Sequence, residues 1–151
     1  MGQILETVLK FFSDDEWPFS RLGERPILRT GFAGDNGEWT CYAQVQEEQE
    51  RFIFYSVCPV KAPEEKRPAM AEFLTRVNYG LVIGNFEMNF SDGEIRSKTS
   101  ADFEGDRASV AVIKNLVYAN VLTMDLYLPG IMSVLYGDVS PAQAITQVEG
   151  K

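Results

Sequence analysis

The sequence predicts an α+β fold: a two-layer sandwich in which a five-stranded, mainly antiparallel sheet carries its helices on one face. Two groups of segments rich in aromatic and β-branched residues read as strands joined by hairpins. Segments with apolar residues at three- and four-residue spacing precede, separate and follow them, as amphipathic helices do. With 151 residues, 45% of them hydrophobic and 24% charged, the chain has the composition of one globular domain covering 1–151.

The elements follow in the order α-β-β-β-α-β-β-α. An apolar stripe predicts a short helix over 3–13. Strands follow over 26–33, 38–46 and 51–58, and the Asn36-Gly37 pair between the first two is a strong hairpin signal. Pairing about the next turn places Cys41 opposite Ser56. A second helix ends at Gly80, where we expect a left-handed stop.

Residues 81–90 and 94–103 form the second predicted hairpin. A two-residue turn at Asp92-Gly93 would place Glu87 opposite Lys98. The apolar side chains of this hairpin then share one face, which we expect in the core: Val82, Phe86, Met88, Phe90 and Ile95. The other face is polar and carries Asn85, Glu87, Asn89, Arg96 and Lys98. An ordinary solvated face is the favoured interpretation, and a surface that docks a partner is the alternative.

The last third of the chain is helical. Residues 108–128 are apolar on nearly every side, and Pro129-Gly130 is expected to break or kink the helix. Lys114 and Asp125 inside the segment argue against a membrane span. Apolar residues such as Val112, Leu116 and Leu122 extend beyond a single stripe. They are buried either between sheet and terminal helices or against another subunit, and the sequence leaves both open.

Charge excludes several classes of partner. The chain has 22 acidic and 14 basic residues, a net charge of −8, and no run of basic residues. Such a surface repels both the phosphate backbone of nucleic acids and an anionic membrane. The first residues lack the features of a signal peptide, so we expect a cytoplasmic protein.

Catalytic and cofactor signatures are missing. With no histidine and only two cysteines, the chain cannot build a Ser-His or Cys-His site or a structural zinc site. Gly80, Gly84 and Gly93 do not match a phosphate-binding loop. The carboxylates of ADFEGD (101–106) fit a helix N-terminus better than a calcium loop. We therefore expect no enzyme activity, no cofactor and no metal.

Five stretches resemble the YbjN family, most closely its cyanobacterial and plastid-type branch: DDEWPF (14–19), EEQERFIFYSVCP (47–59), EFLTRVNYGLVIGNFEMNFSDGEIRSKTS (72–100), MDLYLPGI (124–131) and SPAQAITQVE (140–149). The resemblance implies a fold like that of type III secretion chaperones, which are usually small, acidic, non-enzymatic homodimers that bind extended segments of client proteins. The family is described as sensory-transduction regulators and supplies no catalytic residues.

Together these observations predict a non-enzymatic protein-binding module, a chaperone-like adaptor or regulator that forms a homodimer. The candidate binding residues are Val112, Leu116 and Leu122 of the long helix, the aromatic pair Trp17 and Phe19, and the polar hairpin face. The alternative function is a small-molecule or ion-binding sensor that uses a pocket between sheet and helices.

Overall fold

The computed structural model describes residues 2–150, and within that range six strands form one antiparallel sheet in the order β1-β2-β3-β4-β6-β5. The helices and strands confirm the predicted α+β class. The sheet has one strand more than predicted, because two residues after the first helix pair with the next strand. The elements are α1 (Gln3–Asp14), β1 (Ser20–Arg21), β2 (Ile27–Ala33), β3 (Glu38–Gln46), β4 (Arg51–Val57), the 3₁₀ helix η1 (Glu64–Lys66), α2 (Arg67–Gly80), β5 (Asn85–Met88), β6 (Ile95–Asp102), α3 (Val110–Tyr136) and α4 (Pro141–Glu149).

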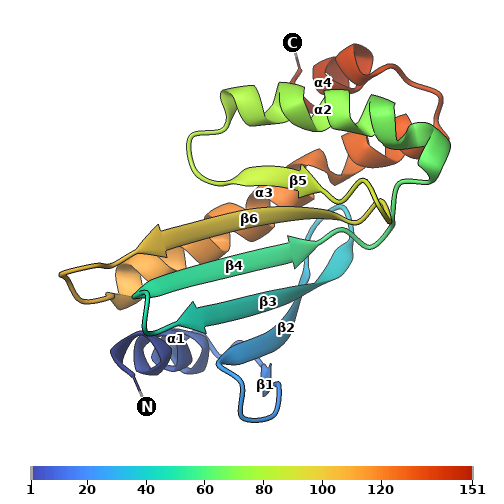
Figure 1. The fold of residues 1–151 in the computed structure, drawn as a ribbon. Helices are drawn as coiled ribbons and strands as arrows, with labels where there is room; N and C mark the ends of the chain where they lie inside the picture. The colour runs from blue at the N-terminus through green and yellow to red at the C-terminus, as the bar shows by residue number, and fades with distance from the viewer. Residues whose placement is uncertain (1, 151) are drawn as a thin grey trace.

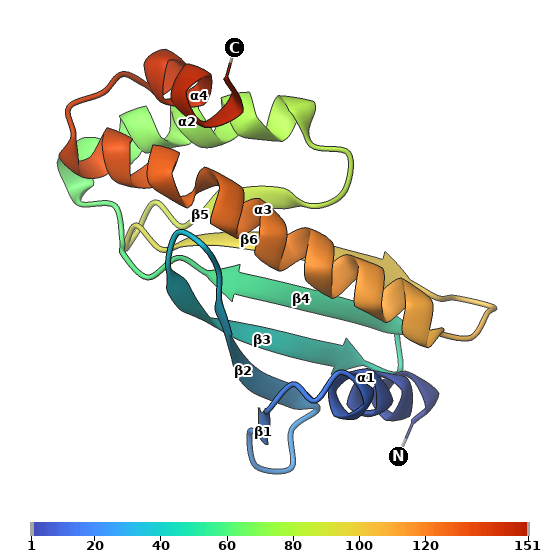
Figure 2. The same ribbon diagram turned by 180° about the vertical axis from the view of Figure 1, so that it is seen from behind.

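Helices α1 and α3 lie against one face of the sheet, the rear face in Figure 1 and the front face in Figure 2. Helices α2 and α4 lie beside the β5 edge and pack on the C-terminal half of α3, around Gly130. Among the described residues, no helix covers the opposite face of the sheet, which is turned toward the viewer in Figure 1. We call this the open face. Helices therefore do occupy one face, as predicted, and α2 and α4 extend the molecule beyond the sheet edge.

The first three long strands pair as the sequence predicts. Cys41 lies opposite Ser56, and the alternating buried residues of β2, β3 and β4 point toward α1 and α3. The turn between β2 and β3 is longer than the Asn-Gly signal suggests, since four residues, 34–37, separate the last paired residues, Ala33 and Glu38. This longer loop reaches α3.

The register of the second hairpin differs from the prediction by two residues. Met88 pairs with Ile95 and Glu87 pairs with Arg96, so six residues, 89–94, form the turn. The Asn89 and Asp92 side chains accept backbone N–H bonds inside it, which stabilises the wider turn. A shift of two keeps the paired side chains on their predicted faces. The polar face of the hairpin is therefore correct, although its pairs are not.

Two residues expected in the core of this hairpin are exposed. Val82 is 95% exposed and Phe90 is 59% exposed, because strand β5 begins only at Asn85 and ends before the turn. Gly84 separates Val82 from the strand by adopting φ 79°, and a Cβ there would lie 2.7 Å from the carbonyl oxygen of Lys98. Helix α2 ends at Gly80, as predicted, but the left-handed conformation expected there is taken by Gly84 instead.

A buried amide fastens α3 to the sheet. Asn120 is 1% exposed, and its Nδ2 donates to the carbonyl oxygens of Phe54 at 2.9 Å and Ser97 at 3.1 Å. Its Oδ1 accepts a 2.8 Å bond from the Ser97 hydroxyl. One turn earlier, the Thr99 hydroxyl donates to the carbonyl of Leu116 at 2.9 Å. These bonds join one helix to β4 and β6 and fix which side of the helix faces the sheet.

Helix α3 continues through Pro129 instead of breaking there. Proline has no N–H to donate to the carbonyl of Asp125, four residues earlier, and Asn36 supplies the missing donor through its Nδ2 at 2.9 Å. The Asp125 carboxylate accepts the backbone N–H groups of Asp35 and Asn36 at 3.1 and 2.8 Å. The β2–β3 loop therefore compensates for the proline and is itself held in place by α3.

Replacing Asn120 with alanine should lower the free energy of unfolding by roughly 2–4 kcal/mol, because buried carbonyls on two strands lose their donor. Urea denaturation followed by circular dichroism measures this change. The control is Lys114→Ala at an exposed position of the same helix, which should change stability by less than about 0.5 kcal/mol. Equal effects of the two substitutions would contradict the role assigned to Asn120.

Candidate protein-binding surfaces

The outer side of α3 carries an uncharged row of residues. Leu122 is 56% exposed and Leu126 is 50% exposed, and no exposed position of α3 between Asn115 and Tyr136 is charged. Alternating three- and four-residue spacing places the row on one side of the helix, as in the seam of a coiled coil. We call this row the α3 stripe: Val112, Asn115, Ala119, Leu122, Leu126, Pro129, Ser133 and Tyr136.

The structure places the three predicted residues of this helix differently. Leu122 lies in the middle of the α3 stripe, and Val112, 39% exposed, lies at its N-terminal end. Leu116 is half-buried and packs against the core, where its carbonyl accepts the Thr99 hydroxyl. Leu126 extends the apolar surface of this helix in the sequence, but neither it nor Tyr136 was among the predicted binding residues, because an all-round apolar helix does not reveal which side its neighbours cover.

The open face carries the predicted polar cluster. Glu87 accepts from Arg96 Nε at 2.6 Å and from Lys98 Nζ at 3.0 Å, so one carboxylate serves two cations. The Arg96 guanidinium lies 4.1 Å from the centroid of the Tyr55 ring. Burial alone would raise the pKa of Glu87, but the hydrogen bonds and charges of Lys98 and Arg96 outweigh burial and lower it below its ordinary value.

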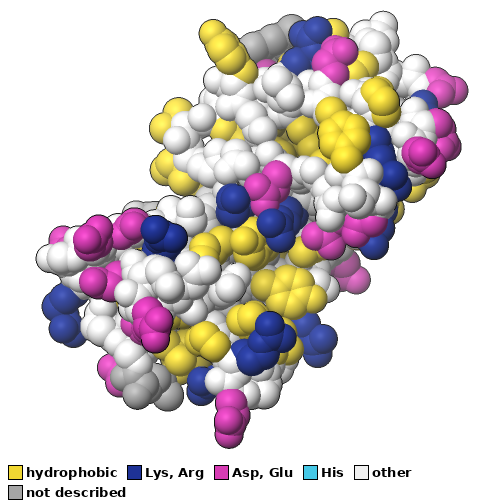
Figure 3. Space-filling model, viewed as in Figure 1, with side chains coloured by type: hydrophobic (Ala, Val, Ile, Leu, Met, Phe, Trp, Pro, Cys, Tyr) yellow, Lys and Arg dark blue, Asp and Glu magenta, His cyan; other side chains and the backbone are white. Residues whose placement is uncertain are grey.

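The other predicted residues of the hairpin face are divided between strand and loop. Asn85 lies on the open face opposite Lys98, whereas Asn89 is in the turn and bonds the N–H of Ser91. Figure 3 shows hydrophobic side chains gathered over the middle of the open face, with lysine and arginine side chains on either side. Two adjoining hollows of about 280 and 380 Å³ meet at Tyr55. This aromatic centre was not identified from the sequence.

Trp17 packs against the interior, whereas Phe19 is exposed, as predicted. The Trp17 indole N–H donates to the carbonyl of Gly31 at 2.9 Å, and its ring contacts Phe11 and Tyr118 edge-on or tilted. Phe19, at 36% exposure, packs on Phe12. The prediction of an exposed aromatic anchor was therefore wrong for Trp17, which fixes the segment after α1 to the core.

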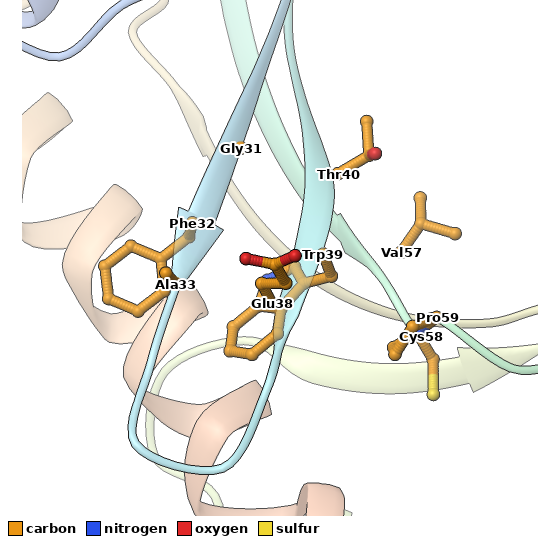
Figure 4. A pocket seen from close by; sticks show the side chains of 9 residues that line it. All are labelled: Gly31, Phe32, Ala33, Glu38, Trp39, Thr40, Val57, Cys58 and Pro59. Atoms are coloured by element: carbon orange, nitrogen blue, oxygen red, sulfur yellow. The ribbon is translucent and has the colours of Figure 1, made fainter.

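A further hollow of about 590 Å³ lies where β3 and β4 separate beyond the Cys41–Ser56 pair (Figure 4). It is lined by β2, β3 and the end of β4, including Trp39 and Cys58, and not by α3. The Trp39 indole N–H is buried and has no hydrogen-bond partner among residues 2–150. This hollow is not the sheet–helix pocket that the sensor alternative requires.

The two cysteines are buried and free. Burial raises the pKa of the Cys41 thiol to about 11 against an opposing hydrogen bond with Ser56, and burial likewise raises that of Cys58 to about 11. Within residues 2–150, no three His, Cys, Asp or Glu side chains are grouped to hold a metal ion. None of the helices in that range has the length and apolar character needed to cross a bilayer.

Comparison with known proteins agrees with this geometry. The profile of the YbjN family, described as "Putative bacterial sensory transduction regulator", matches residues 5–133. No curated protein matches the chain.

Solved structures with the same fold include YbjN from E. coli, described as "a putative transcription regulator". It matches with a TM-score of 0.60 and 10% identity over 89% of this chain and 90% of that one. A chain of the ExsC–ExsE complex matches with a TM-score of 0.58 and 10% identity over 82% and 90%. A chain of the HopA1–SchA chaperone–effector complex has 16% identity over 80% and 89%, with a TM-score of 0.47. The first two support the expected chaperone-like fold.

The Glu87 cluster predicts a pH dependence of stability. Because the pKa of Glu87 is lowered on folding, its stabilising effect is complete above the unfolded pKa near 4.5 and is lost as the pH falls through the lower folded pKa. The difference in unfolding free energy between wild type and Glu87→Gln should stay constant from neutral pH to about pH 5.5 and shrink below it. Urea titrations at several pH values measure this, with Glu104→Gln in an exposed loop as control. A difference that grows in acid would contradict the assignment.

The buried thiols should be unreactive in the folded protein. With pKa values of about 11, roughly one thiol in a thousand is ionised at pH 8, and neither sulfur reaches solvent freely. Absorbance with a disulfide reagent such as Ellman's should show slow reaction in buffer and rapid reaction of both cysteines in guanidinium chloride. Rapid modification of either cysteine in the native state would refute this prediction.

Proposed function

The chain belongs to the YbjN family, and from that premise we propose that it is a non-enzymatic, cytoplasmic protein-binding module, a chaperone-like adaptor or sensory-transduction regulator of the cyanobacterial and plastid-type branch. The α3 stripe is the observation that carries the proposal. A solvent-facing helical row of about seven turns without a charge is costly to leave in water and favours a protein neighbour. The ExsC–ExsE complex is a precedent for protein binding by this fold.

We take the neighbour on the α3 stripe to be a second copy of the chain. Two chains of net charge −8 repel each other, and contact between them costs least where neither carries charge. The three- and four-residue spacing of the stripe suits packing against another helix, and a twofold axis would place each stripe on its own counterpart. The uncharged row is thus self-complementary.

Substituting glutamate for Leu126 should convert a dimer into a monomer, since it places two carboxylates near the symmetry axis of an apolar contact. Size-exclusion chromatography with light scattering should give about twice the 17.0 kDa chain mass for wild type and about the chain mass for Leu126→Glu. The control Lys114→Glu lies on the same helix outside the stripe and should remain dimeric. A monomeric wild type, or a dimeric Leu126→Glu, would overturn the proposed dimer contact.

A further inference from the structure

The open face has a different chemistry from the α3 stripe, and we propose that it binds an extended acidic segment of a partner protein. The segment carries an acidic residue, an apolar residue two positions later and a second acidic residue after two more. The inference rests on the proposed function as a protein-binding module. It goes beyond that function by naming a second binding site and the chemistry of the segment that binds there.

Charge on the open face departs from that of the whole molecule. Its strand residues carry four cations and three anions, whereas the chain as a whole carries −8. Glu94, in the adjoining turn, brings this balance to zero. Excess positive charge remains at two places. Arg29 forms no ion pair with any residue in 2–150, and Arg96 and Lys98 share the single carboxylate of Glu87.

The strand register places these cations at the two ends of an aromatic row. Arg29 on β2 pairs with Tyr42 on β3, Tyr42 pairs with Tyr55 on β4, and Tyr55 pairs with Lys98 on β6. Three steps between neighbouring strands separate Arg29 from Lys98 by about 14 Å. Tyr42 and Tyr55 are half-buried in the centre, beside the two adjoining hollows.

An extended peptide has a matching repeat. Its residues i, i+2 and i+4 project to the same side, and four residues span about 13 Å. Acidic residues at i and i+4 therefore reach Arg29 at one end and Lys98 with Arg96 at the other. The residue at i+2 then lies over Tyr42 and Tyr55, where an apolar or aromatic side chain finds the hydrophobic centre of the face.

The sheet edges are poor sites for such a segment. The side chain of Asn78 accepts the N–H of Phe86 at 2.7 Å and donates to its carbonyl at 2.9 Å, which occupies the outward backbone groups of β5 there. The other edge strand, β1, has two residues. Short and occupied edges disfavour the addition of a strand from another protein. The face of the sheet is the larger surface that remains.

The segment comes from another protein because this chain does not contain one. An acidic residue, an apolar residue and an acidic residue at i, i+2 and i+4 occur nowhere in the sequence; the nearest match, Asp102 and Asp106, has Glu104 between them. Nucleic acid carries a negative charge at every nucleotide, whereas the segment carries only two, so the net charge of −8 opposes nucleic acid much more strongly.

The test uses the full chain and a fluorescein-labelled peptide, Ser-Glu-Thr-Phe-Thr-Glu-Ser, in fluorescence anisotropy at low salt. We expect saturable binding that weakens about tenfold or more when both peptide glutamates become glutamine, and about tenfold with Arg29→Glu. Lys98→Gln should also lower the affinity for the peptide. Arg107→Glu, an equal charge change in the exposed loop before α3, should leave binding within about twofold.

Several outcomes would overturn the inference. The inference would be wrong if the peptide did not bind at low salt, or if Arg29→Glu and Arg107→Glu lowered its affinity equally. It would also be wrong if an oligothymidylate displaced the peptide. If Leu126→Glu abolished peptide binding and Arg29→Glu did not, the site would lie on the α3 stripe instead. A changed mass of Arg29→Glu in light scattering would make the open face a contact between copies. The mass of the wild type tests the proposed dimer separately, so either proposal can fail alone.

Discussion

The side-chain amide of Asn120 decides how the two layers of this protein meet. It lies between α3 and the sheet, where it bonds the carbonyls of Phe54 and Ser97 on neighbouring strands and accepts the Ser97 hydroxyl. An amide satisfied on all sides in a buried site tolerates one orientation of the helix, because any rotation would leave donors or acceptors without partners. An apolar residue at this position would allow an almost uniformly apolar helix to turn. The polar bonds thus select the side of α3 that remains outside.

Two surfaces of different character follow from that orientation. Helix α3, which carries the α3 stripe, lies on the side of the sheet turned toward the viewer in Figure 2, and the open face is on the opposite side, as Figure 1 shows. One is uncharged and self-complementary, and the other combines aromatic rings with excess positive charge at two ends. The two proposed contacts therefore use opposite sides of the molecule, so neither would block the other. Asn78 and the short β1 strand protect the edges between these surfaces.

Local features of the sequence were sufficient for the strand faces and insufficient for the turns. The faces of the residues that pair in the second hairpin were predicted correctly, because alternation survives a register shift of two, whereas Val82 and Phe90 lie outside the strand and are exposed. Its pairs were wrong, because Asn89 and Asp92 stabilise a wider turn through side-chain bonds that an Asp-Gly pair alone does not reveal. Trp17 shows the same limit: it was predicted as part of an exposed aromatic anchor, yet the carbonyl of Gly31 and the Phe11 ring hold it inward.

The sequence by itself determined the fold class, the order of most elements, the absence of histidine chemistry and the polar character of the hairpin face. These depend on residue type, on periodicity and on the preferences of the chain over a few neighbouring positions. Tertiary structure alone decided that Leu126 is exposed while Leu116 is half-buried, and that Arg29, Tyr42, Tyr55 and Lys98 form one row. Both facts depend on contacts between residues far apart in the chain. Such contacts are set by packing and by buried hydrogen bonds, which no local pattern encodes.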